Sequence, residues 1–363
     1  MHRRNIFFLG AFVFTGIGVS ACALLGAAPS IAAPLDTGLK LAAVTPSPET
    51  EQQREARLIE GAKREGKVVY WDTASNLESV FTKFRQKYPF LVMEYWKSTD
   101  EAIYQKIPAE ARAGVHNFDV AGVEINFLAE LRKTGLMKKY DWPNAKEWSP
   151  EHKGRDGSWV ARSLNCVAAA YNTNLVSGTE APKSWDDLLD PKWKGLMSMG
   201  KDDTDLVLML WAAWGKEKTV NYLKALARNN VALGEGVTAR TEMLSAGAYK
   251  IDVRLNLDRV LDYQRRGAPI EWVRTDPMLT RPTPIFVAER APHPNAALLF
   301  ADWFTSLEGQ QAFHDASGKL LPDPRVKSKL GDAVKGQRLM FFPVELGLDG
   351  NEAQRLWREI FLK

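Results

Sequence analysis

Short apolar runs alternate with amphipathic stretches along most of the chain. Residues 67–71, 91–96 and 118–123 are rich in β-branched and aromatic side chains, which predicts three strands. Between the first two runs, residues 77–84 place apolar side chains at the i, i+3, i+4 and i+7 positions of a helix. Alternating strands and helices of this kind favour a mainly parallel sheet covered by helices on both faces.

A longer strand-like segment, WVARSLNCVAAAY, follows at residues 159–171. It exceeds the length of an ordinary strand, so we expect it to carry the chain from one lobe to a second. Strands are predicted at residues 196–199 and 249–255, with helices between them, and residues 270–273 are expected to lead the chain back.

The stretch after this return has a clear pattern of its own. Residues 285–288 predict a short strand, and the next helix has its apolar stripe at positions 296, 299, 300 and 303. Thr305 and Glu308 have the spacing of a capping box for a second helix, and Gly318 lies where a left-handed residue would end that helix. By the same reasoning Ser98 and Thr238 are predicted helix caps.

The first 33 residues combine Arg3 and Arg4, a long apolar run and small residues near Ala33, as an export signal does. A retained membrane anchor is the alternative, since the run approaches the length of a spanning helix. The segment around Cys22 resembles a lipoprotein cleavage box, and the paired arginines resemble a twin-arginine signal. Residues 34–50 are rich in Pro, Thr, Ser and Ala and predict a flexible arm.

Composition narrows the class of protein. A chain of 363 residues with 45% hydrophobic content can bury the cores of two domains. Removal of the leader takes away two of the 48 basic residues and leaves 46 against 44 acidic ones, a formal charge of +2, so we expect no nucleic-acid partner. Of the two cysteines, Cys22 lies in the leader and Cys166 is expected to be buried, which leaves no intramolecular disulfide.

Candidate ligand contacts follow from the rule that open parallel sheets bind ligands beyond the carboxyl ends of their strands. The loops selected are 73–76, 98–100, 124–126, 201–205, 235–238 and 254–258. The predicted cleft residues are Thr73, Ser75, Asn76, Ser98, Thr99, Glu124, Arg162, Asn165, Arg254 and Asn256. Hydroxyls and amides would orient the ligand, and the arginines would bind an anionic group.

Several of these residues have a purely structural alternative. Ser98 can serve as a helix cap, and Glu124 can be an acid stabilised by a helix dipole. Arg162 and Arg254 can each form a salt bridge across the lobes.

Sequence motifs of catalysis are missing from the chain. It has no G-x-S-x-G elbow, no phosphate loop ending in G-K-S/T and no H-E-x-x-H, and its histidines lack zinc-site spacing. We therefore expect no enzyme, no cofactor and no bound metal, with an exported enzyme on the same fold as an alternative.

Longer motifs cover residues 54–322. They include EGKVVYWDTAS, ARAGVHNFDVAGVEIN, AYNTNLVSGTEAPKSWDDLLDPKWKG, AGAYKIDVRLNLDRVLDYQRRGAPIEWV and the stretch 281–321. Together they resemble bacterial extracellular solute-binding proteins of the iron(III)-type ABC transporter family.

The resemblance implies a type II periplasmic-binding-protein fold of class α/β. Each of its two lobes is a mainly parallel sheet flanked by helices, and crossing hinge strands join them. The expected organisation is an export signal at 1–33, an arm at 34–50, a first lobe of 51–163 with 273–345, and a second lobe of 164–272. The implied protein is a periplasmic monomer that captures a small-molecule solute and delivers it to an inner-membrane ABC permease.

Iron is a separate question within that family. The resemblance implies that ferric members hold iron through adjacent tyrosines, a histidine after the first strand and a glutamate after the third. The tyrosine positions fall here at Leu255, Asn256 and Leu257, residues 73–76 hold no histidine, and Glu124 alone matches. Because a hard trivalent ion prefers anionic oxygen ligands, we expect a small polar organic solute, with ferric iron or an iron chelate as the alternative.

Overall fold

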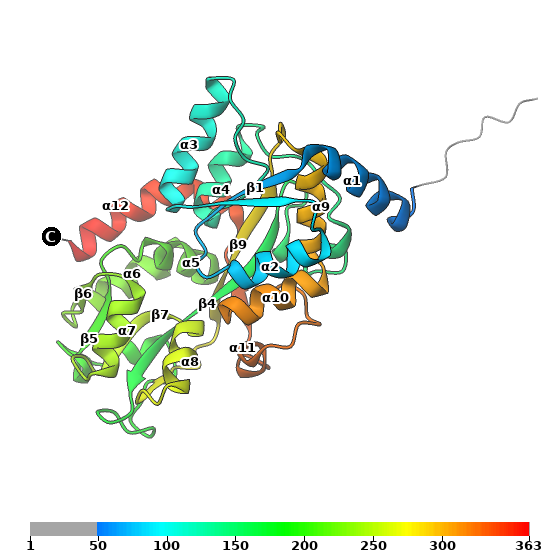
Figure 1. Ribbon diagram of the computed structural model, residues 1–363. Helices are drawn as coiled ribbons and strands as arrows, with labels where there is room; N and C mark the ends of the chain where they lie inside the picture. The colour runs from blue at the N-terminus through cyan, green and yellow to red at the C-terminus, as the bar shows by residue number, and fades with distance from the viewer. Residues whose placement is uncertain (1–48, 363) are drawn as a thin grey trace, which may run out of the picture. The chain divides into compact units, whose positions relative to one another are not determined.

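A ten-stranded sheet runs through residues 49–362, the part of the chain that the computed structural model describes. Its main path has the strand order β2-β1-β3-β9-β4-β7-β5-β6, while β10 pairs with β9 and β8 pairs with β4. Helices cover both ends of this path, and two long strands run between them (Figure 1).

The first part of the chain builds one end of the sheet. Its elements are α1 (Glu51–Glu65), β1 (Lys67–Asp72), α2 (Glu78–Lys87), β2 (Val92–Lys97), α3 (Asp100–Arg112), β3 (Val120–Gly122) and α4 (Ile125–Arg132). β1 pairs in parallel with both β2 and β3, as the alternation of strands and helices predicts. Val80, Phe81 and Phe84 of α2 are buried, which confirms the apolar stripe.

The middle of the chain builds the other end. Its elements are β4 (Val160–Asn172), β5 (Met197–Gly200), α5 (Thr204–Trp214), α6 (Lys216–Ala227), β6 (Ala232–Gly234), α7 (Val237–Ser245), β7 (Ile251–Asn256), α8 (Leu257–Arg265) and β8 (Ile270–Trp272). β5 is parallel to β6 and β7. The prediction missed β6, because its three half-buried residues are too few to show a period.

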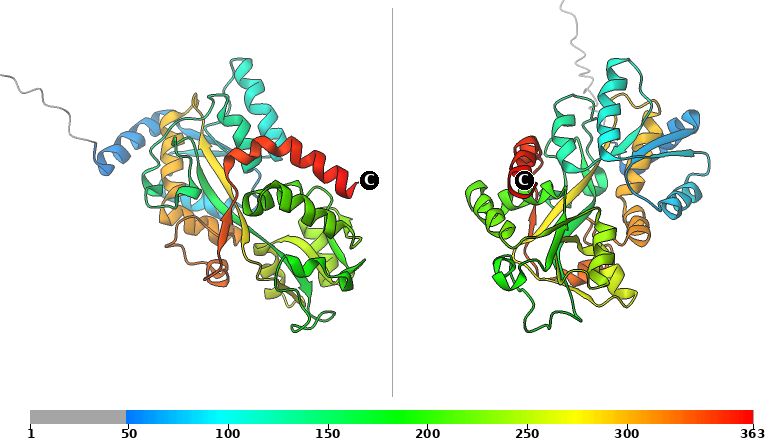
Figure 2. Two further views of the ribbon diagram at one scale, coloured as in Figure 1. Left: turned by 180° about the vertical axis from the view of Figure 1, so that it is seen from behind. Right: turned by 90° about the vertical axis from the view of Figure 1, so that its left-hand side faces the viewer.

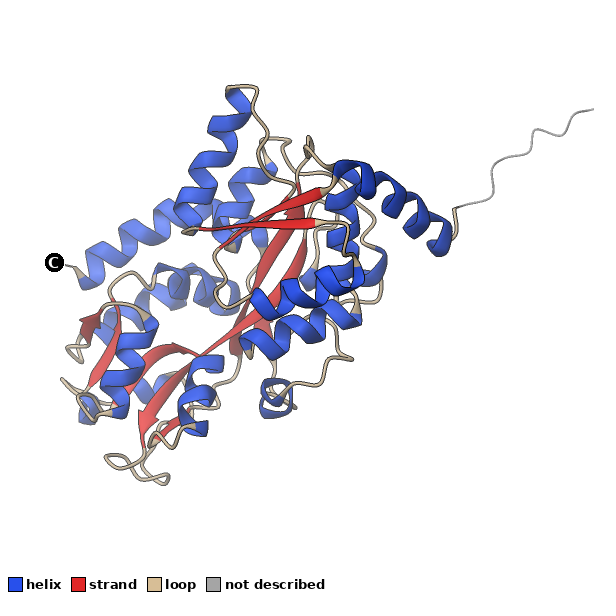
Figure 3. Ribbon diagram, in the orientation of Figure 1, coloured by secondary structure: helices blue, strands red, loops and turns tan. Residues whose placement is uncertain are grey.

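Two strands connect the ends of the sheet, β4 and β9 (Met278–Val287), and they are antiparallel to each other (Figure 3). Their register runs from Val160 opposite Ile285 to Val167 opposite Leu279, and the rest of β4 pairs with β7 and β8. All thirteen residues of β4 are buried, including the polar side chains of Arg162, Ser163, Asn165 and Asn172.

β9 is longer than predicted. The expected strand begins at Ile285, whereas the observed one begins at Met278 and includes Pro282 and Pro284. Proline has no N–H to donate to a sheet, and within sheets it is found mainly on edge strands, at strand starts or in bulges. Its fixed φ is nevertheless compatible with extended backbone, and the Pro284 carbonyl accepts from the amide of Val123 at 3.3 Å.

The return of the chain forms α9 (Pro294–Thr305) and α10 (Leu307–Ser317), followed by α11 (Lys329–Ala333), β10 (Leu339–Phe341) and α12 (Gly350–Phe361). The stripe of α9 is buried as predicted, with Phe300 fully enclosed. Gly318 ends α10 in the left-handed conformation with φ 68°, which is also as predicted.

Three predicted helix caps are wrong. Ser306, not Thr305, caps α10, because the Thr305 hydroxyl donates back to the carbonyl of Ala301. Thr99 rather than Ser98 caps α3, and Gly236 rather than Thr238 precedes α7. Each error is one or two residues, since a cap must have extended backbone in addition to a suitable side chain.

The C-terminal segment touches both ends of the sheet. A short 3-10 helix, Val344–Asp349, lies so close to α4 that a Cβ on Gly347 would come within 2.9 Å of Ala129. α12 packs beside α5 and α6 (Figure 2), where the buried Trp357 indole donates to the carbonyl of Lys201 at 2.7 Å. The prediction ended the first lobe at residue 345 and did not foresee α12.

The predicted export signal, Cys22 and nearly all of the predicted arm lie outside the described residues. Within residues 49–362, no helix has both the length and the apolar character needed to cross a membrane. Residues 49–363 belong to one compact unit, and the predicted lobe boundaries inside it stay a prediction.

Candidate functional site

A polar cavity of about 540 Å³ lies where loops from both ends of the sheet meet. It is lined by the β1–α2 loop, the start of α4, β4, β9, α8 and the end of α10. Seven of the ten predicted cleft residues line it: Thr73, Ser75, Asn76, Glu124, Arg162, Asn165 and Asn256.

The β1–α2 loop is shaped by its own side chains. The Asp72 carboxylate accepts from the amide of Ala74 at 2.8 Å, which turns the chain away from β1. Asn76 then adopts a left-handed conformation with φ 62°, which few residues other than glycine tolerate as well as asparagine. Thr73, Ser75 and Asn76 are thereby presented to the cavity.

Arg162 of β4 is the most deeply buried basic group that lines the cavity, with 3% of its side chain exposed. Its Nε lies 3.0 Å from Oδ2 of the fully buried Asp72, whose carboxylate also accepts from the Tyr70 hydroxyl. Although burial opposes the charge, Asp72 raises the pKa of Arg162. Its Nη2 lies 3.5 Å from the Thr73 hydroxyl, and its Nη1 has no hydrogen-bond partner among residues 49–362.

Glu124 precedes α4 and lies at the junction between the two ends of the sheet. Its Oε2 is 3.0 Å from Nη1 of Arg281 on β9, and the same nitrogen is 3.3 Å from Oδ2 of Asp205 at the start of α5. The Glu124 amide donates to Asp100 at 2.7 Å. Burial, together with the charge of Glu124, raises the pKa of Asp100 to about 7.

Arg254 does not line the cavity, whereas Arg162, the other arginine predicted to do so, does. It is 3% exposed and forms ion pairs with Asp205 and, at 3.8 Å, with Asp203. Burial alone would raise the pKa of Asp205, but the charges of Arg254 and Arg281 together hold this pKa below its usual value. Arg254 thus forms salt bridges, but with partners in the same predicted lobe, 164–272, and not across the lobes as the predicted alternative had it.

The two remaining predicted residues lie away from the cavity. Thr99 accepts from the amide of Ala102 at 3.2 Å as the cap of α3, and Ser98 precedes it without lining the cavity. Asn165, in contrast, is built into the wall, since its Oδ1 accepts from Lys319 at 2.7 Å and its Nδ2 donates to Thr283 at 3.3 Å.

Sequence reasoning missed several charged lining residues, in particular Arg259 and Arg265 of α8, Arg266 directly after it, Arg281 of β9 and Lys319 after α10. Arg259 was within reach of the prediction, because it directly follows the selected loop 254–258. The others face the cavity only because of how α8, β9 and α10 pack, which no local pattern shows.

No three His, Cys, Asp or Glu side chains gather at metal-binding distances within the described part of the chain. Leu255 and Leu257, at the positions that the family resemblance compares with tyrosines, are fully buried and contribute no oxygen.

Comparison with known proteins agrees with this architecture. The profile of the bacterial extracellular solute-binding protein family matches residues 117–344. A Fe(3+)-binding periplasmic protein of Serratia marcescens is 24% identical over 186 residues, which are 48% of this chain but only 55% of that protein, so the chain spans about half of its relative's length.

Solved structures share the fold. A Trichodesmium protein in complex with iron and citrate ligands superposes with a TM-score of 0.70 at 17% identity, covering 82% of this chain and 100% of that one. AfuA from Actinobacillus pleuropneumoniae, solved with exogenous fructose-6-phosphate bound, gives a TM-score of 0.66 at 21% identity, covering 82% of this chain and 99% of that one. The predicted type II periplasmic-binding-protein fold and the resemblance to the iron(III)-type family are confirmed.

Proposed function

Because the chain belongs to the family of bacterial extracellular solute-binding proteins, we propose that it is the substrate-binding component of an ABC importer. In this proposal it captures a small polar solute in the periplasm and delivers it to an inner-membrane permease without a catalytic step. We propose a monomer, with lobes of residues 51–163 plus 273–345 and of residues 164–272.

The observation that carries the proposal is the position of the polar cavity. Its lining comes from loops at both ends of the sheet, and the extended strands β4 and β9 run between those ends. A few extended residues can absorb the rotation of two lobes that close on a ligand. A cavity of about 540 Å³ also falls in the range of small-molecule sites.

Ferric iron or an iron chelate is the second candidate, since relatives with this fold are described as iron-binding. The residues at the site argue against bare iron, because Glu124 already pairs with Arg281 and residues 255–257 carry no phenol. A chelate that brings its own oxygen ligands does not need such residues.

Thermal unfolding of the purified protein with a panel of solutes tests the proposal. A ligand at 100 times its Kd stabilises the folded state by about 2.7 kcal/mol, and we expect at least one solute to raise Tm by about 5 °C. That solute should be recovered unchanged after incubation with the protein. Recovery of a product would show that the protein is an exported enzyme and not a binding protein.

Addition of ferric citrate separates the two candidates. We expect no visible phenolate-to-iron absorption band. A strong band with one iron per chain would make iron the cargo, whereas stabilisation without a band would indicate an intact chelate.

A further inference from the structure

We propose that the solute is an organic oxyanion, with its acidic group bound at Arg162 and its body extending into a second cavity beside α8. This inference rests on the proposed function and names the substrate class for the same cleft. Two sources of an oxyanion group, a phosphate and a carboxylate, fit the chemistry described below.

The first observation is the unpartnered donor of Arg162. Only 3% of its side chain is exposed and the residue lines the cavity, yet Nη1 has no acceptor within residues 49–362. A buried donor left without a partner costs about 1–3 kcal/mol, so an acceptor from the solute would remove this cost. A guanidinium can donate two parallel hydrogen bonds to two oxygens of a carboxylate or a phosphate.

The second observation is the balance of charge around the cavity. Six basic and four acidic side chains line it. Each of the four acids already has a basic partner: Glu124 pairs with Arg281, Asp258 with Lys319, Asp262 with Arg265 and Arg266, and Asp315 with Lys83. Arg259, which is half-buried, has neither an ion pair nor a side-chain hydrogen bond in the described chain. The spare charge of the cavity is therefore positive.

The third observation concerns the helices that begin at this cavity. Neither α2, preceded by Leu77, nor α8, preceded by Asn256, has a side chain that caps its first N–H groups. The two helices come from opposite ends of the sheet, and their positive dipole ends lie at the lining loops 73–76 and 256–259. Uncapped helix starts bind anions. Together with Arg162 they form a site for an oxyanion that contacts both lobes.

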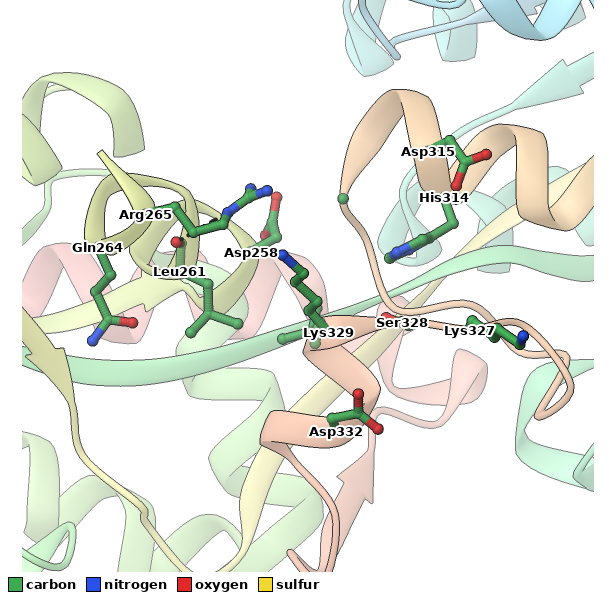
Figure 4. A pocket seen from close by; sticks show the side chains of 12 residues that line it. Asp258, Leu261, Gln264, Arg265, His314, Asp315, Lys327, Ser328, Lys329 and Asp332 are labelled. Atoms are coloured by element: carbon green, nitrogen blue, oxygen red, sulfur yellow. Dashed lines mark hydrogen bonds between the residues drawn. The ribbon is translucent and has the colours of Figure 1, made fainter. Parts of the chain in front are cut away.

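A second cavity of about 680 Å³ adjoins the first and shares Asp258, Arg265, Asp315 and Gly318 with it. Figure 4 shows its walls: Leu261 and Gln264 of α8 on one side, His314 of α10 on the other, and Lys327 to Asp332 below. A lone phosphate or metal ion would leave this space unused. We therefore expect a solute with an organic body that reaches past Asp258 toward Leu261.

Thermal unfolding and calorimetric titration of the full chain test the class of solute. The probes are glucose, glucose 6-phosphate, citrate and inorganic phosphate, with sodium chloride at matched ionic strength. We expect glucose 6-phosphate or citrate to raise Tm more than chloride does, and comparison of these two identifies the phosphate or the carboxylate. If none of the three anions exceeds chloride, or if glucose binds as tightly as its phosphate, the inference is overturned.

The outcomes also separate this inference from the proposed function. Stabilisation by glucose or another neutral solute that is recovered unchanged would support the solute-binding function but contradict the inference that the solute is an oxyanion. Conversion of any probe into a product would reject the proposed function itself.

Three variants test the contacts. Arg259→Gln is expected to weaken anion binding about tenfold, whereas Arg355→Gln, on the exposed face of α12, is the matched control and should bind as the unaltered chain does. Arg162→Lys keeps the charge beside Asp72 and should fold, but it loses the planar donor pair and is also expected to bind about tenfold more weakly. Equal affinities for all of these chains would contradict the site.

Leu261→Trp tests the second cavity. The larger side chain should fill part of the space beside α8, so it is expected to weaken binding of the organic anion about tenfold while leaving inorganic phosphate unaffected. Unchanged binding of the organic anion would show that the solute does not extend there.

Discussion

Arg162 and Arg254 lie on β4 and β7, which are adjacent strands, and each is 97% buried. Arg254 is surrounded by acceptors, with Asp205 and Asp203 as ion-pair partners and the Asn256 amide oxygen at 3.3 Å from Nη1. Arg162 has a single carboxylate partner, Asp72, and an unpartnered Nη1. Two arginines that look equivalent in the sequence therefore differ in how many carboxylates they pair with and in whether they line the cavity.

The difference follows from the number of carboxylates around each guanidinium. The Arg254 side of the sheet also holds Arg240, which contacts both oxygens of Asp252 at 2.9 and 3.1 Å and approaches Asp203 at 3.3 Å. This buried network pairs charges with charges and resists change, because removal of one member leaves an uncompensated partner. The Arg162 pair is smaller and faces the cavity.

The largest effect is expected from Arg254→Gln. It removes one partner of Asp205 and one of Asp203, so the free energy of unfolding should fall by about 3–5 kcal/mol, as measured by urea denaturation. The double variant Asp205→Asn/Arg254→Gln removes both charges of the closest pair and should recover more than half of the loss. Its affinity for inorganic phosphate should remain within about threefold of the unaltered chain. A large loss of affinity in the stable double variant would make Arg254 a binding residue and break the comparison.

The same contrast shows what the sequence can predict. Local periodicity identified most strands and helices, because an apolar stripe such as that of α9 shows in the spacing of residues three and four positions apart. The rule of strand ends also selected the loop 73–76 and Glu124, which do line the cavity. These elements and loops can be recognised from the order of residues along the chain alone.

What the sequence could not show depends on distant contacts. Asp205 is separated from Arg254 by 49 residues, and nothing near either residue indicates that they pair. The strand β9 begins before its predicted start because pairing with β4 keeps residues 279–285 extended, which no local pattern shows. α12 was missed although its buried residues Ala353 and Trp357 lie four positions apart, a helical spacing that local periodicity can show.

An intermediate effect is expected from pH, through Asp100 on the Arg162 side. Burial and Glu124 raise its pKa to about 7 in the folded state, above the usual 3.8, while Arg162 acts in the opposite direction and Asp72 adds to the rise. The folded state thus retains a proton that the unfolded state has lost, and stability falls as pH rises through 7. Between pH 5 and pH 8 the unaltered chain should lose about 2–3 kcal/mol more than Asp100→Asn does.

Asparagine is a suitable control here, since its amide oxygen can still accept from the Glu124 amide as Asp100 does at 2.7 Å. Urea denaturation of both chains at pH 5, 6.5 and 8 measures the difference. Parallel losses in the two chains would show that Asp100 is ionised in the folded state.

The smallest effect is expected at Arg281, where the two clusters meet. One nitrogen, Nη1, lies 3.0 Å from Glu124 and 3.3 Å from Asp205, and 15% of the Arg281 side chain is exposed. Ion pairs that solvent reaches contribute up to about 1 kcal/mol, so Arg281→Gln should lower the free energy of unfolding by about that amount.

Asp205 already has Arg254 as a partner, whereas Glu124 has no other ion pair in residues 49–362. A double-mutant cycle of Arg281→Gln with Glu124→Gln should therefore give a larger coupling energy than the cycle with Asp205→Asn. The reverse order would place Arg281 in the closed network of Arg254 and leave Glu124 available to the cavity.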